Sequence, residues 1–124
     1  WSAIGGGIHD FNEQEGGGSH GKALGIMLYG PDGQIAGGLI GETHWNWLYI
    51  NLLFLPEELR RQGYGKRLME QAEAIGRQRG AAHAYLDTFS FQAPEFYAKL
   101  GYEVYGELKD FPVGHTRYFM RKEL

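Results

Sequence analysis

The stretch LYINLLFLPEELRRQGYGKRLME, residues 48–70, decides how this chain folds. Its first part, residues 48–55, is apolar, aromatic and partly β-branched, which predicts a largely buried strand. Pro56 ends that strand, because proline cannot donate a hydrogen bond to a strand ladder. A glycine-containing turn follows, and apolar residues at spacings near 3.6 then predict a helix from about Gly65: Leu68, Met69, Ala72 and Ile75.

A strand, a glycine turn and a helix in this order form an arrangement that can hold a phosphate group. The first backbone N–H groups of a helix have no partner within it, and the helix dipole makes that end positive. Glycine lets the backbone approach an anion closely because it has no Cβ atom. An isolated Gly-x-Gly is better interpreted as a tight turn with solvated neighbours. Here the preceding strand and four basic residues favour an anion site: Arg60, Arg61, Lys66 and Arg67.

Two motifs in this region and downstream of it are typical of one family. Arg60-x-x-Gly63-x-Gly65 matches the pattern Q/R-x-x-G-x-G/A, and residues 93–102, APEFYAKLGY, match A-x-x-F-Y-x-K-L-G-F/Y. Both patterns, in this order, belong to the GNAT N-acetyltransferases, which the chain therefore resembles. The resemblance extends from about Ile35 to the C-terminus, and more loosely to the segment before it.

Length and composition limit the alternatives. The chain has 124 residues, enough for one domain with one core, and 43% of them are hydrophobic. Its formal net charge of −3 gives no cationic field that would attract nucleic acid or a membrane surface. Cysteine is absent, which excludes disulfides and a thiol nucleophile and fits a cytoplasmic protein. No apolar run has the length of a membrane span, and no signal-peptide pattern is present at the N-terminus.

The remaining patterns predict a single α/β domain over residues 1–124. Two apolar strands, residues 23–29 and 34–40, flank the turn signal GPDG and form a β-hairpin. Glycines 37, 38 and 41 indicate a bulge or a close backbone approach in the second strand. Residues 42–46 either connect the hairpin to the central strand or continue its second strand and turn into it. The other predicted elements are helices at 1–14, 65–79 and 92–100, and strands at 82–88, 102–108 and 116–122.

The helix at 65–79 is expected to carry Glu70, Glu73, Arg77 and Arg79 on its outer face. The crossover from residue 48 to residue 88 implies a parallel strand pair, with a ligand at the carboxyl ends of its strands. The resemblance implies more: a GNAT-like mixed, mostly antiparallel sheet whose parallel pair splays apart to admit acetyl-CoA, flanked by helices. Family members usually begin with a further strand, and no counterpart of that strand is found in this sequence.

The resemblance also assigns residues to the binding of acetyl-CoA, used as a co-substrate. Backbone amides of the glycine turn, with the charges of Arg60 and Arg61, would hold the pyrophosphate: Gln62, Gly63, Tyr64, Gly65 and Lys66. The main chain of the strand end would run beside the pantetheine arm, although a buried strand end is the plain structural alternative: Leu53, Phe54 and Leu55. Ser90 and Gln92 stand where many members have an asparagine that contacts pantetheine.

Acetyl transfer to an amine needs a general base and a proton donor for the leaving thiolate. Tyr97 matches the family tyrosine that often protonates the thiolate, and its alternative role is that of a core aromatic residue. The candidate bases are polar residues on or near the central strand, of which Glu42 and Asp87 are preferred: Glu42, His44, Tyr49 and Asp87. Asn51 lies there too, but an amide cannot serve as a base. Each of them alone is more often a solvated polar group, and an amine selected by its own pKa would need no base.

Two other groups of side chains bear on function, one of aromatic residues and one of histidines. Trp45, Trp47 and Tyr49 alternate along the chain and would share one face of a strand, where they line an acceptor pocket or serve core or dimer packing. The five histidines lack the spacing of metal ligands, so no metal site is expected.

The predicted function is N-acetylation of a primary amine of a small molecule, by direct attack on acetyl-CoA in a ternary complex. Two alternatives keep the same fold: acetylation of a protein or peptide amine, and a noncatalytic acyl-CoA-binding domain. An unrelated phosphate-binding module is disfavoured by the second motif. The family resemblance also makes a homodimer an expectation, because many members are dimers.

Overall fold

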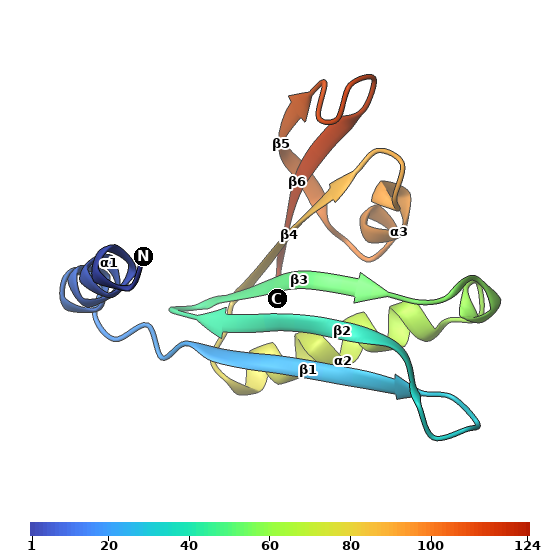
Figure 1. Ribbon diagram of the computed structural model, residues 1–124, viewed down its shortest axis with the longest axis horizontal. Helices are drawn as coiled ribbons and strands as arrows, with labels where there is room; N and C mark the ends of the chain where they lie inside the picture. Colours follow the sequence, from blue (N-terminus) through green and yellow to red (C-terminus); the bar gives the residue numbers. More distant parts are fainter.

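The computed structural model describes residues 1–124, and its framework is one six-stranded sheet (Figure 1). The strands lie side by side in the order β1-β2-β3-β4-β6-β5, and β3 and β4 form the one parallel pair among antiparallel neighbours. The predicted mixed, mostly antiparallel sheet is therefore confirmed. The elements are α1 Ser2–Glu15, β1 Lys22–Tyr29, β2 Ile35–His44, β3 Trp47–Phe54, the 3₁₀ helix η1 Glu57–Leu59, α2 Tyr64–Gln78, β4 His83–Phe89, α3 Pro94–Lys99, β5 Glu103–Lys109 and β6 Thr116–Glu123.

Most predicted elements are present with ends shifted by one or two residues, and the second strand differs most. It does not stop at Ile40 but continues to His44, and Trp45 and Asn46 then form a tight turn into β3. Of the two alternatives for residues 42–46, the continuous strand is the observed one. The 3₁₀ helix after Pro56 was not predicted, because a single short turn of helix has no periodicity to detect.

Glycines of β2 allow its neighbours to come unusually close, as the sequence indicated. A Cβ atom at Gly41 would overlap the carbonyl oxygen of Tyr49, and one at Gly37 would overlap that of Phe54. The pairing of β2 with β3 shifts its register between Ile40 and Gly41, which is the predicted irregularity. Bulges bend the strand that carries them, so this feature helps β3 to turn away from its other neighbour, β4.

The parallel pair is very short. It joins Trp47 to His83, Leu48 to Ala84 and Tyr49 to Tyr85, and no pairing is found beyond these residues. In Figure 1 β3 then runs on with β1 and β2, whereas β4 leaves at a wide angle together with β5 and β6. The splayed pair that the family resemblance implied is therefore confirmed.

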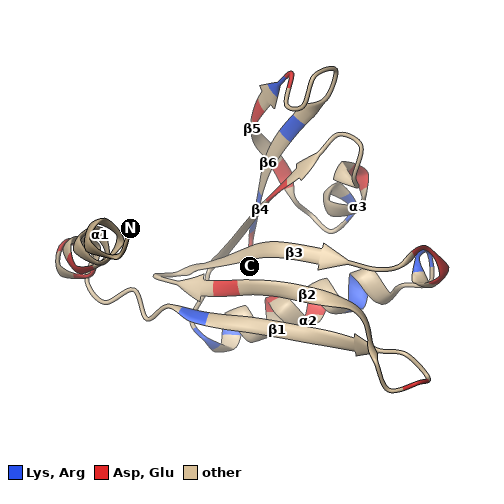
Figure 2. Cartoon of the chain, viewed as in Figure 1, with Lys and Arg blue, Asp and Glu red and all other residues tan.

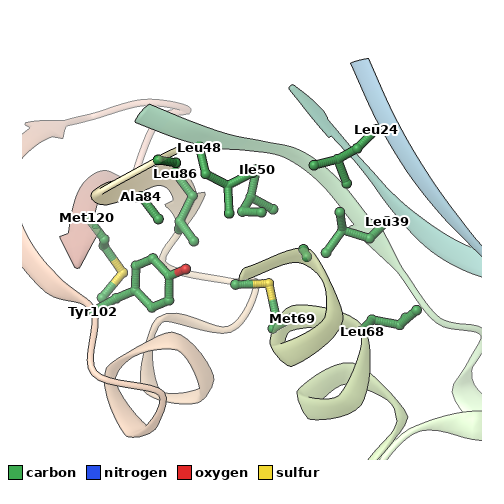
Figure 3. Packing of buried hydrophobic residues seen from close by; sticks show 12 residues of the cluster. Leu24, Leu39, Leu48, Ile50, Leu68, Met69, Ala84, Leu86, Tyr102 and Met120 are labelled. Atoms are coloured by element: carbon green, nitrogen blue, oxygen red, sulfur yellow. The ribbon is translucent and has the colours of Figure 1, made fainter. Parts of the chain in front are cut away.

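The hydrophobic core lies between one face of the sheet and α2, with α3 packed at its edge. Alternate strand residues point into it, including Leu39, Leu48 and Leu86, and they meet Met69 of α2 (Figure 3). Phe96, Tyr97 and Leu100 of α3 are partly buried against the same cluster. Fully burying such a side chain contributes about 1.5–3 kcal/mol. The opposite face of the sheet has no comparable cover.

Glu73 does not lie on the outer face of α2, so that prediction was wrong. It is only 5% exposed, and its carboxylate accepts hydrogen bonds from the Tyr102 hydroxyl at 2.9 Å and from Lys122 Nζ at 2.8 Å. Burial, reinforced by the neighbouring Glu73 carboxylate, raises the pKa of Tyr102, so the phenol keeps its proton. A buried carboxylate is stable only when it is paired and hydrogen-bonded, and this one ties α2 to β6 and to the start of β5.

Helix α1 is well formed despite its three glycines, but none of its residues is buried. Trp1, Ile4, Ile8 and Phe11 lie along one side of it and are all exposed. None of the three α-helices has the length and hydropathy that crossing a membrane requires.

Removing the cation beside Glu73 should destabilise the fold strongly. We expect Lys122→Met to lower the free energy of unfolding by about 3 kcal/mol, because it leaves a buried carboxylate without its ion pair. The matched control is Arg77→Met. The Arg77 guanidinium lies 3.8 Å from the same carboxylate but is half exposed, so its removal should lower the free energy of unfolding by less than about 1 kcal/mol. Urea unfolding of both variants measures this. Equal losses would contradict the assignment of Lys122 as the essential partner.

Candidate active site

The splay leaves one edge of β3 without a strand partner. Beyond Tyr49 the side of β3 that faces β4 is unpaired as far as Phe54, whereas its other side stays paired with β2. An unpaired edge inside a sheet presents a row of backbone donors and acceptors that an extended ligand can pair with. Of the three predicted residues here, Leu53 and Leu55 pack against the core, and Phe54 is exposed.

A second set of free backbone groups lies at the start of α2. The N–H groups of residues 62–66 have no backbone hydrogen-bond partner; the first bond of the helix runs from Arg67 N to Gly63 O, at 3.1 Å. Gly63 caps the helix with φ of 86°, a left-handed conformation that glycine adopts without strain. These N–H groups and the helix dipole form the anion-binding arrangement that the sequence predicted.

Basic residues lie in the turn before α2 and on its first turn, and the acidic Glu57 and Glu58 of η1 lie in the same turn (Figure 2). Arg60 is partly committed to the turn itself, because its Nε donates to the Leu55 carbonyl at 2.9 Å. Arg61, Lys66 and Arg67 are exposed. The positive charge is therefore available to a ligand that lies on the free N–H groups.

The two glycines of the motif do different things. Gly63 is exposed and has open space around the position of a Cβ atom. Gly65 is buried, and a Cβ atom there would lie 3.1 Å from Cζ of Phe96. Gly65 thus lets α3 pack against the helix start, so any residue larger than glycine would disturb that packing as well as a bound anion.

Tyr97 lies on α3, partly buried beside the rings of Phe96 and Tyr102. The Tyr97 side chain is only partly buried, and its hydroxyl is open to solvent rather than sealed in the core. Burial of the ring raises the pKa of Tyr97 to about 12. The phenol is therefore protonated at neutral pH and can donate a hydrogen bond.

Ser90 and Gln92 both have partners within the chain. Ser90 Oγ accepts a hydrogen bond from Thr116 N at 3.0 Å, and Gln92 Oε1 accepts one from Phe89 N at 2.8 Å. These bonds shape the turn between β4 and α3. The side-chain amide nitrogen of Gln92 keeps its donor capacity for a ligand.

The two predicted bases lie on the uncovered face of the sheet in different surroundings. Asp87 on β4 is held by Arg117, with 2.8 Å from Oδ1 to Nη2 and 3.0 Å to Nε. Glu42 on β2 is half exposed, and its nearest charged neighbour is His44 Nδ1, at 3.9 Å. Tyr49, opposite Glu42, has its pKa raised by burial and by the Asp87 carboxylate, so it stays protonated. Of the two predicted bases, Glu42 is therefore the one whose carboxylate is not bound by a lysine or arginine.

An aromatic pocket of about 350 Å³ opens on the same face, next to the point where β3 and β4 part. Trp45 and Trp47 were predicted to line such a pocket, and they do, together with the candidate residue His44; Tyr49, predicted there with them, does not line it. The other lining residues were missed: Tyr85, Tyr105 and Arg121. Alternation along residues 82–88 could have placed Tyr85 on this face with Asp87. Nothing local in the sequence brings Tyr105 or Arg121 to it.

The turn between β2 and β3 holds the N-terminal loop beside this pocket. Trp45 Nε1 donates to the Gly16 carbonyl at 2.9 Å, and Trp45 N donates to the Ser19 carbonyl at 2.7 Å. A second hollow, about 360 Å³, continues from His44 and Trp45 to Glu42 and the end of α1. The chain has no cluster of three or more His, Cys, Asp or Glu side chains placed to hold a metal ion.

Comparison with known proteins agrees with this geometry. A model of the acetyltransferase (GNAT) family matches residues 8–102, most of the chain, and the chain therefore belongs to that family. A blasticidin-S acetyltransferase from Streptomyces morookaense is 40% identical over 96 residues, which are 77% of this chain and 71% of the relative. An acetyltransferase from Agrobacterium fabrum is 36% identical over 101 residues, which are 82% of this chain and 74% of the relative.

A solved structure is also similar over nearly the whole chain. The crystal structure of an acetyltransferase from Bacillus cereus superposes with a TM-score of 0.92 and 33% identity, covering 99% of this chain and 90% of the other. Family membership, the named relatives and the free backbone groups at the splay and at α2 together define the chain as an acetyl-CoA-dependent acetyltransferase.

A charge placed at Gly63 should block the anion site without disturbing the fold. Both Asp and Asn tolerate a left-handed backbone, and a Cβ atom at Gly63 meets open space. We expect Gly63→Asp to weaken acetyl-CoA binding at least about tenfold, or about 1.4 kcal/mol, since its carboxylate would oppose the pyrophosphate. The uncharged control Gly63→Asn should stay within a few-fold of the wild type. Calorimetric titration measures both, and equal affinities would contradict the site.

Proposed function

We propose that this chain transfers the acetyl group of acetyl-CoA to a primary amine of a small molecule, by direct attack in a ternary complex. The observation that carries the proposal is the aromatic pocket that opens beside the splay of β3 and β4. An open pocket of about 350 Å³ lies in the range of small-molecule sites, and Tyr85, which lines it, belongs to the last rung before the unpaired edge of β3 begins.

The residues present fit acetyl-CoA. The N–H groups of residues 62–66 would receive the pyrophosphate, and the basic side chains around them would add attraction. The unpaired edge of β3 would bind the pantetheine arm as an added strand. When bound, acetyl-CoA supplies an activated acyl group, whose carbonyl a free N–H of β3 would polarise.

Glu42 is the proposed base. It would take a proton, through water, from the ammonium form of the acceptor, because it is half exposed and no lysine or arginine is bound to it. Asp87 is less available, since Arg117 occupies its carboxylate. The freed amine nitrogen then forms its bond to the carbonyl carbon, and the bond from that carbon to sulfur breaks. The nitrogen gives up its second proton to solvent water, and the sulfur receives a proton from a separate donor.

Tyr97 is the proposed proton donor to the departing thiolate. Its phenol is protonated at neutral pH, because burial raises its pKa to about 12, and its hydroxyl has no partner in the protein. What supports Tyr97 as part of the same site is that its neighbour Phe96 packs against Gly65 at the start of α2.

The acceptor is proposed to be a small molecule rather than a protein. One relative, 40% identical, is named a blasticidin-S acetyltransferase, so blasticidin S is the first amine to test. We expect thiol release from acetyl-CoA that depends on blasticidin S or another small amine. Acetylation of peptide amines alone would overturn the choice of acceptor, and binding of acetyl-CoA with no transfer to any amine would favour a noncatalytic domain.

Tyr97→Phe should lower kcat about a hundredfold and leave the affinity for acetyl-CoA unchanged, because it removes one hydroxyl that acts late in the reaction. In the wild type, titration of Tyr97 should cause no loss of rate up to about pH 10, since the phenol holds its proton until its pKa of about 12. Tyr29→Phe, at the exposed end of β1, is the control for loss of a phenol outside both the thioester site and the aromatic pocket. An unchanged kcat in Tyr97→Phe would remove it as the donor.

We further propose that the chain forms a homodimer through the exposed apolar side of α1. Exposure of four large apolar side chains on one side of a helix to water is unfavourable, and a partner surface would remove them from water. Light scattering should report a dimer that the double variant Ile8→Glu, Phe11→Glu dissociates and that Gly6→Glu, on the opposite side of α1 with open space around its Cβ position, leaves intact. A wild-type monomer at micromolar concentration would contradict this.

A further inference from the structure

Four side-chain positions form one row across the uncovered face of the sheet. Glu42 on β2 pairs with Tyr49 on β3, Tyr49 pairs with Tyr85 on β4, and Tyr85 pairs with Arg121 on β6. The row crosses the last rung of the parallel pair, directly before the strands separate. A molecule that lies along the row would therefore cross the start of the splay, with one end on the β2 side and the other on the β6 side.

The middle of the row is a surface of stacked rings. The Tyr49 and Tyr85 rings stack at 4.8 Å, with an interplanar angle of 27°, and Trp47 meets Tyr85 edge-on at 5.6 Å. Trp45 and Tyr105 extend the apolar wall of the pocket. Such a surface favours a flat ligand with a π-face, because offset stacking adds to the burial of its area.

The ends of the row carry opposite and uncompensated charges. Arg121 lines the pocket and makes no ion pair or cation–π contact, although Arg117, four residues earlier on β6, is held by Asp87 at 2.8 Å. Glu103 stands opposite Arg121 on β5 and forms no ion pair with it. At the other end, Glu42 shares a hollow with Lys22 but is ion-paired with no lysine or arginine; His44 Nδ1 lies 3.9 Å away. A guanidinium without a partner, in an aromatic pocket, is suited to a carboxylate or phosphate.

We propose that this row is the acceptor subsite and that it selects a flat, zwitterionic amine: an aromatic or heteroaromatic ring with an anionic group at one end and the reacting amine at the other. The inference rests on the proposed function and names its substrate class. Arg121 binds the anion, Tyr85 and Trp47 bind the ring, and Glu42 faces the amine. A purely cationic acceptor is disfavoured, because Arg121 repels it.

The dimensions agree with such a molecule. Glu42 and Arg121 are three strand steps apart, about 14 Å between backbones at roughly 4.8 Å per step. Both have long side chains, which reduce the span that the ligand must fill to about the length of one substituted ring. A molecule of this kind leaves its amine on the side where Tyr49 ends the parallel pairing.

Three probe amines test the inference because they differ in one feature each. 4-(Aminomethyl)benzoate has the ring and the anion, 4-(aminomethyl)benzamide lacks the charge, and trans-4-(aminomethyl)cyclohexanecarboxylate lacks the flat ring. Acetylation is followed by thiol release with saturating acetyl-CoA, and binding by quenching of tryptophan fluorescence. We expect kcat/KM for the benzoate to exceed that of each of the others by about tenfold or more.

Two variants assign the preference to residues. Arg121→Gln should bring the kcat/KM ratio of benzoate to benzamide down to about one, and Trp47→Leu should do the same to the ratio of benzoate to the cyclohexane compound. Lys109→Gln, an exposed cation at the far end of β5, is the control and should change neither ratio.

The inference is overturned if the three probes react equally, if Arg121→Gln leaves the ratio intact, or if the benzoate neither binds at millimolar concentration nor reacts. These failures are separable from failure of the proposed function. If the proposed function fails, acetyl-CoA does not bind or no amine of any kind is acetylated. If only this inference fails, another amine is still a substrate.

Discussion

Three residue pairs between β3 and β4 are the constraint on which the rest of this structure depends. They hold two halves of the sheet together and then end, so that β3 presents an unpaired edge beside the start of α2. Glycines of β2 contribute, because they let β2 and β3 pack closely through an irregular register that bends β3. A continuous parallel ladder would be more stable as a sheet and would leave no place for the pantetheine arm.

The two halves separated by the splay are joined again through α2. This helix packs under β1 to β3, and its buried Glu73 bonds to Tyr102 and Lys122 of the other half. The same helix starts with Gly63 and the free N–H groups, so the anion site is fixed relative to both walls of the splay. Gly65 adds a contact with α3, which carries Tyr97. The free N–H groups, the contact with α3 and the buried ion pair therefore all belong to one helix.

Local patterns predicted what is local in the chain, and missed what is assembled across it. The strand, turn and helix at residues 48–78, and the motif at 93–102, are contiguous, so the sheet type, the anion site and Tyr97 could be inferred. Glu73 lies four residues after Met69, on the buried side of α2, but a charged residue is expected at the surface unless its partners are known. Those partners lie 29 and 49 residues away in the sequence. Arg121 and Tyr105 join the pocket only through strand register, which sequence patterns do not fix.

The most direct test of the central claim is hydrogen–deuterium exchange with and without acetyl-CoA. The splay predicts that two separate segments gain protection on binding, the edge of β3 at residues 50–55 and the start of α2 at residues 62–66, because both have N–H groups free to pair with the ligand. Gly63→Asp should abolish both changes together. Tight binding that protects neither segment, or only the helix start, would contradict the account of the splay as the cofactor cleft.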